Sequence, residues 1–80
     1  MIVAYSMIIV KRGFLERVTE ELSKIRGVTR VSVVTGIYDV VARIEVESLD
    51  DLYRVSREID SIDGIERTNT HVVEKERSIE

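Results

Sequence analysis

The spacing of hydrophobic and polar positions changes along the chain, and each spacing predicts one element. β-Branched and large apolar side chains fill residues 2–10, which predicts a strand that ends at the turn signal of residues 11–13. From residue 14 to residue 25 the apolar positions fall at helical spacing with charged residues between them. Gly27 follows where a helix C-cap needs positive φ, so this segment predicts an amphipathic helix of about three turns.

The second half of the chain repeats this order. Residues 28–35 and 40–47 predict two strands joined as a hairpin, because both are rich in β-branched residues and the second alternates apolar and polar positions. Ser48 begins a second helix with a sequence like a capping box, and its apolar spacing ends at Gly64. Residues 65–73 predict the fourth strand.

An internal repeat relates the two halves. Apolar and glycine positions recur at a constant offset, and the clearest pairs are Leu15 with Leu52, Val18 with Val55, Leu22 with Ile59 and Gly27 with Gly64. This βαβ order written twice predicts an α+β, ferredoxin-like βαββαβ fold with a four-stranded antiparallel sheet and both helices on one face. We expect residues 1–74 to form this domain and residues 75–80 to form a charged C-terminal tail.

The first strand is apolar on both of its faces. One face carries Val3, Tyr5, Met7 and Ile9, and the other carries Ile2, Ala4, Ile8 and Val10. Both helices cover one side of the sheet, so the other side needs a cover that one chain does not supply. We expect an isologous, face-to-face homodimer, and higher ring oligomers remain open. The alternative, an ordinary scatter of exposed hydrophobic residues, is disfavoured because the run is contiguous.

Composition and charge narrow the possible functions. The 80 residues include no cysteine, which excludes disulfides, thiolate metal sites and a cysteine nucleophile. The 12 basic and 15 acidic residues are scattered and give a net charge of −3, which argues against direct binding of nucleic acid. There is no apolar run long enough to span a membrane and no signal-peptide pattern, so we expect a cytoplasmic location. The scarcity of amide side chains suggests a thermophilic source.

The sequence predicts no catalytic site, and no cofactor or metal. His71 is the only histidine, and no serine or aspartate close to it in sequence suggests a triad. The acidic side chains around the second helix suit its N-terminus or solvent, and they are Asp50, Asp51, Asp60 and Asp63. Metal binding would need more convergent ligands than these.

The connection between the second and third strands offers candidate binding chemistry, and its residues are Gly36, Ile37, Tyr38 and Asp39. Backbone N–H groups near Gly36 could hold a carboxylate and Asp39 could hold an ammonium group, the two charges of a free amino acid. Thr68 and Thr70 of the last strand could add hydroxyl ligands. The residues alone leave an alternative open, in which Tyr38 packs on a neighbour, Asp39 caps its own turn and the threonines pair across strands.

Three motifs carry a resemblance to a known family. They are Thr35-Gly36 followed by Ile37-Tyr38-Asp39, then Ile62-Asp63-Gly64-Ile65, and finally Arg67-Thr68-Asn69-Thr70-His71-Val72-Val73. Together they resemble the effector-binding domain of the Lrp/AsnC family, also called the RAM domain, over essentially the whole chain. Full-length members carry an N-terminal helix-turn-helix domain, whereas this sequence begins at the first strand. The resemblance therefore implies a stand-alone RAM protein.

The resemblance also implies a function. It implies a sheet-to-sheet dimer, further assembly of dimers into a ring such as an octamer, and an amino-acid site at the contact between dimers. The favoured function is an amino-acid-binding regulatory module that co-assembles with full-length Lrp/AsnC regulators, with residues 36–39, Thr68 and Thr70 as ligand-binding residues. The alternatives are a small ferredoxin-like enzyme and an ACT-like regulatory domain, whose site would lie at residues 11–13.

Overall fold

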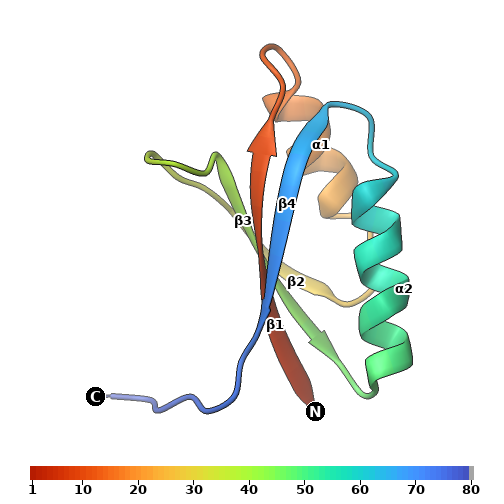
Figure 1. The fold of residues 1–80 in the computed structure, drawn as a ribbon, viewed down its shortest axis with the longest axis vertical. Helices are drawn as coiled ribbons and strands as arrows, with labels where there is room; N and C mark the ends of the chain where they lie inside the picture. Colours follow the sequence, from red (N-terminus) through yellow and green to blue (C-terminus); the bar gives the residue numbers. More distant parts are fainter. Residues whose placement is uncertain (80) are drawn as a thin grey trace.

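The computed structural model describes residues 1–79 and confirms the ferredoxin-like fold. The elements are β1 (Ile2–Val10), α1 (Leu15–Leu22), β2 (Val28–Val33), β3 (Val40–Val46), α2 (Leu49–Asp60) and β4 (Ile65–Val72). The antiparallel sheet has the strand order β2-β3-β1-β4, so β1 and β3 lie at its centre. Both helices cover one face of this sheet (Figure 1). Within residues 1–79 no helix is long and apolar enough to cross a membrane.

The core lies between the helices and the even-numbered side chains of the two central strands. These side chains are Ala4, Ser6 and Ile8 of β1 and Val40, Ala42, Ile44 and Val46 of β3. They pack with Val18 and Leu22 of α1 and with Leu52, Val55 and Ile59 of α2. Full burial of one such aliphatic side chain stabilises the folded state by about 1.5–3 kcal/mol. The sheet therefore turns the face that carries these side chains towards the helices.

α1 is shorter than the predicted three turns and ends at Leu22. The Ser23 hydroxyl donates to the carbonyl oxygens of Thr19 and Glu20, both at 2.9 Å, and such bonds compete with continuation of the helix. The next turn is of the tighter 3₁₀ type, in which the Ile25 N–H donates to the Leu22 carbonyl at 3.2 Å. This turn keeps Ile25 in the core although it lies outside the helix.

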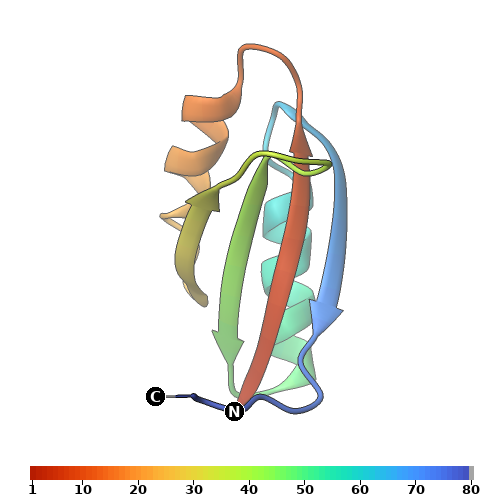
Figure 2. The same ribbon diagram turned by 90° about the vertical axis from the view of Figure 1, so that its left-hand side faces the viewer.

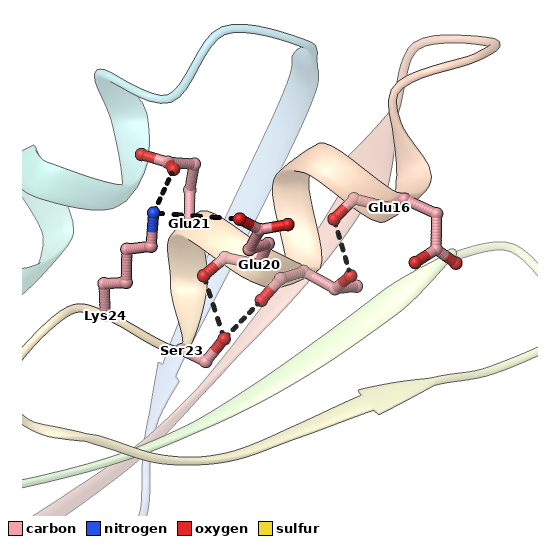
Figure 3. A network of polar contacts seen from close by, with 6 residues as sticks. Glu16, Glu20, Glu21, Ser23 and Lys24 are labelled. Carbon is pink, nitrogen blue, oxygen red and sulfur yellow. Dashed lines mark hydrogen bonds and ion pairs between the residues drawn. The ribbon is translucent and has the colours of Figure 1, made fainter.

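Charged side chains at the end of α1 pair with one another (Figure 3). Lys24 Nζ lies 3.1 Å from Glu21 Oε2 and 3.8 Å from Glu20 Oε1. The hydrogen bond to Glu21 and the charges of both carboxylates raise the pKa of Lys24 above its usual value. These groups are exposed, so the pairs add little to stability.

The start signal of α2 is confirmed, whereas both helices end before their glycines, with C-caps at Ser23 and Ser61, and β2 ends at Val33, before the predicted residue 35. Ser48 is the N-cap of α2, and its hydroxyl oxygen accepts a hydrogen bond from the Asp51 N–H at 3.2 Å. The repeat-related Gly27 and Gly64 both have positive φ, at 107° and 100°. A Cβ on Gly64 would lie 2.5 Å from the ring of Phe14, so this position needs glycine for close packing as well as for φ.

The face of the sheet turned away from the helices is called the outer face below. Its side chains are Val3, Tyr5, Met7 and Ile9 of β1, Val41, Arg43 and Glu45 of β3, and Arg67, Asn69 and His71 of β4. The four β1 side chains are half-buried, as the doubly apolar strand predicts. Two segments cross this face, the β2–β3 connection near one end and the residues after β4 near the other (Figure 2).

The residues after β4 are held to the outer face by one polar cluster. The Tyr5 hydroxyl donates to Glu76 Oε2 at 3.1 Å, and Arg43 Nε donates to the Tyr5 oxygen at 3.4 Å. Arg43 also pairs with Glu45 and with Glu76. The hydrogen bond to Tyr5 is the main cause that raises the pKa of Arg43 above its usual value. The start of the predicted tail therefore contacts the sheet.

Candidate functional site

The β2–β3 connection is anchored to β1 by its last residue, Asp39. The Asp39 N–H donates to the Ile8 carbonyl at 2.9 Å, and its carbonyl accepts from the Val34 N–H at 2.9 Å. Its carboxylate oxygen Oδ2 accepts from the Val10 N–H at 2.8 Å. The register of β1 against β4 shifts between Ile9 and Val10, so the Asp39 side chain satisfies a backbone group at an irregularity of the strand.

This contact gives the Asp39 carboxylate a structural role that sequence reasoning missed. The residue does not cap its own turn, because the group it binds belongs to Val10 on a different strand. Its second oxygen, Oδ1, accepts no hydrogen bond from any residue in 1–79. A carboxylate has acceptor sites on both oxygens, so Asp39 can hold β1 and a ligand at the same time.

The other three residues of the connection are more open. Gly36 has φ of 140°, and Ile37 is 83% exposed. The Tyr38 hydroxyl accepts a hydrogen bond from Asn69 Nδ2 of β4 at 2.8 Å, which ties the connection across the outer face. Backbone N–H groups of residues 35–38 donate no hydrogen bond within the described chain. Tyr38 therefore contacts a neighbour, as the alternative interpretation expected.

Within one chain, Thr68 and Thr70 are not brought to this connection. Both are in register with core-facing positions of β1, so they lie on the side of the sheet that the helices cover. The Thr68 hydroxyl donates to Asp60 Oδ1 of α2 at 3.0 Å. Asn69 lies between them, faces the opposite way and is the β4 residue that reaches Tyr38. A polar wall that combines the threonines with residues 36–39 is therefore not present on one face of the protomer.

A cavity of about 200 Å³ opens beside Asp39, between the turn after β1 and the end of β2. Its apolar lining is Val10, Leu15, Val33 and Val34, and its charged lining is Lys11, Arg12 and Asp39. Sequence reasoning considered residues 11–13 and residues 36–39 as separate candidates. It missed that the fold places Asp39 against the β1 turn, because that contact depends on the pairing of β3 with β1.

Two larger hollows lie elsewhere, and of their cationic side chains only Arg26 has no carboxylate within 4.0 Å among residues 1–79. One of about 290 Å³ is beside the start of α2, and one of about 350 Å³ is between the two helices. Arg54 pairs with Asp51 and Glu58 in the first, and Arg17 pairs with Asp63 in the second. In contrast, Lys11 and Arg12 have no carboxylate within 4.0 Å among residues 1–79. The smaller cavity is therefore the better candidate site for a charged ligand.

Comparison with known proteins decides the family. Residues 3–79 match the Lrp/AsnC ligand binding domain. The chain belongs to the Lrp/AsnC family. The match confirms the resemblance drawn from the sequence.

Individual relatives agree with this assignment. The HTH-type transcriptional regulator FL11 of Pyrococcus furiosus is 34% identical over 74 residues, which cover 92% of this chain and 49% of FL11. The structure of TTHA0845 from Thermus thermophilus matches with a TM-score of 0.91 and 29% identity, over 99% of this chain and 100% of that one. Escherichia coli AsnC matches with a TM-score of 0.89 and 25% identity, over 99% of this chain and 54% of AsnC.

Two properties of these relatives bear on the earlier expectations. This chain spans from 34% to 49% of the length of the curated relatives it matches, which are named as HTH-type transcriptional regulators. Pyrococcus and Thermus are thermophiles, which fits the thermophilic composition of the sequence.

Proposed function

We propose that this Lrp/AsnC domain is a regulatory module that binds an amino-acid effector in the cavity beside Asp39, and that it is not an enzyme. One observation carries the proposal. Asp39 lines a cavity together with Lys11 and Arg12, its Oδ1 accepts no hydrogen bond within residues 1–79, and neither cation has an ion-pair partner in the described chain. Opposite charges across a small cavity match the two ends of a zwitterion.

The chemistry assigns one end of the effector to each side of the cavity. The ammonium group binds Asp39 Oδ1, because a buried ammonium needs a counter-charge to offset its lost hydration. The carboxylate binds Lys11 and Arg12. This replaces the expected contact with N–H groups near Gly36 and Tyr38, since neither residue lines the cavity.

The size of the cavity supports a small effector. Its volume of about 200 Å³ lies below the roughly 300–1,000 Å³ typical of pockets for drug-sized ligands. Its apolar lining, from Val10, Leu15, Val33 and Val34, provides contact for a short side chain. An amino acid fits these limits better than a nucleotide or a peptide.

The test is a thermal-shift screen of the proteinogenic amino acids. A ligand present at one hundred times its Kd stabilises the folded state by about 2.7 kcal/mol. We expect at least one amino acid to raise the melting temperature. The same screen with Asp39→Asn keeps an acceptor oxygen for the Val10 N–H but removes the charge, so the thermal shift should fall to half or less. Asp50→Asn, at an exposed position on α2, is the matched control and should show the same thermal shift as the native protein. No shift with any amino acid contradicts the proposal.

The homodimer expected from the sequence is part of this proposal. The outer face is half-buried along β1 although the helices lie on the other side, and Val41 of β3 extends the apolar strip. A second copy placed face to face supplies the missing cover and adds stability to a small chain without cysteines. Ring assembly and co-assembly with full-length Lrp/AsnC regulators stay predictions from the resemblance, as does the expectation of no direct contact with nucleic acid.

A further inference from the structure

The cavity beside Asp39 has more positive than negative charge. Lys11 and Arg12 line it, Asp39 is its one acidic lining residue, and one oxygen of that carboxylate already binds the Val10 N–H. This local surplus occurs on a chain whose net charge is −3. In the two larger hollows, by contrast, Arg54 and Lys24 have carboxylate partners. The unpaired Arg26 shares its hollow with three acidic residues, so that hollow has no surplus of positive side-chain charge.

A neutral amino acid leaves the cavity with one net positive charge. Its ammonium pairs with Asp39 and its single carboxylate is shared between Lys11 and Arg12, so two cations face one anion. A basic side chain would add a third positive charge to Lys11 and Arg12. A second carboxylate on the ligand pairs every charge in the cavity.

We infer that the effector is an acidic amino acid of the size of glutamate or aspartate, selected by Lys11 and Arg12. This inference rests on the proposed function and assigns the class of its ligand. The guanidinium of Arg12 can grip a carboxylate through two parallel N–H groups, while the ammonium of Lys11 acts as a point charge. The apolar lining provides contact for the methylene groups of the ligand.

The test compares L-glutamate with L-glutamine by isothermal titration calorimetry on the full chain, because the two ligands differ mainly in one charge. We expect glutamate to bind at least about tenfold more tightly than glutamine, a difference of about 1.4 kcal/mol. L-Aspartate, L-leucine and L-lysine complete the set. Aspartate should bind more tightly than leucine or lysine.

Substitutions then assign the preference to residues. Lys11→Gln and Arg12→Gln should each reduce the ratio of glutamate to glutamine affinity towards one. Both side chains are exposed and unpaired in the described chain, so the melting temperature without ligand should stay unchanged. Arg57→Gln removes an equal charge from the exposed surface of α2 and should leave the ratio as it was.

The outcomes separate this inference from the proposed function. If leucine or glutamine binds as tightly as glutamate, the inference is overturned while the effector-binding function stands. If glutamate is preferred but Lys11→Gln and Arg12→Gln keep the full preference, the assignment to this cavity is overturned. If no amino acid binds, the proposed function fails and the inference fails with it.

Discussion

The Asp39 carboxylate and the Val10 N–H meet at 2.8 Å across 29 positions of sequence. This bond fastens the β2–β3 connection to the end of β1 and fixes one wall of the cavity. One oxygen of the carboxylate serves the fold and the other faces no partner in residues 1–79. Substitutions at Asp39 can therefore separate stability from binding.

Asp39→Ala should destabilise the protein even without a ligand. The substitution leaves the half-buried Val10 N–H without its acceptor, and loss of a hydrogen bond to a charged group costs about 1.5–3 kcal/mol. Urea denaturation followed by circular dichroism measures this loss. Asp63→Ala is the control, because its 3.8 Å ion pair with Arg17 is exposed and worth little. Equal stability of the two variants would show that the Asp39 bond does not hold the connection.

Gly64→Ala should destabilise the protein far more than Gly13→Ala. Both glycines have positive φ, at 100° and 87°, so an alanine at either position carries a strain of about 1–2 kcal/mol. Only at Gly64 would the new Cβ also overlap Phe14, whereas nothing lies within 4 Å of it at Gly13. Thermal unfolding should therefore show a drop of several degrees for Gly13→Ala and a clearly larger one for Gly64→Ala. Similar drops would mean that Phe14 moves aside without cost.

A charge in the middle of the outer face should dissociate the proposed homodimer. Met7 is half-buried on that face, and removing hydration from an unpaired lysine at an interface costs several kcal/mol. Light scattering should report two chains, or a multiple of two, for the native protein and a mass near 9.2 kDa for Met7→Lys. Tyr53→Lys changes an exposed residue on α2 and should keep the native mass. A native mass near 9.2 kDa at micromolar concentration rules out the homodimer.

The elements and the core were predictable because their signals are local. Alternation along β3 identifies both faces of the sheet, and the Ser48 cap marks the start of α2. The early end of α1 was not predicted, because the helical spacing continues to Ile25 while the Ser23 hydroxyl binds the preceding carbonyls. Apolar spacing predicts which residues are buried, but it does not predict whether the backbone between them stays helical.

The candidate site was predictable only in part, because it depends on contacts between distant segments. Asp39 was selected for its charge, but its bond to Val10 depends on the strand order. In the sequence Lys11 and Arg12 mark only a turn, because their place beside Asp39 depends on the assembled sheet. Thr68 was grouped with the turn by residue type, whereas its register with β1 directs it to Asp60 on the helix side.

Calorimetric titration of the native protein and of Asp39→Asn, with the amino acid that gives the largest thermal shift, tests the central claim most directly. The account predicts saturable binding to the native protein at one site per chain. It predicts at least a tenfold weaker affinity for Asp39→Asn, which should unfold at nearly the native temperature because its amide oxygen still accepts from Val10. Unchanged affinity in a folded Asp39→Asn variant would contradict the assignment of the effector's ammonium group to this carboxylate.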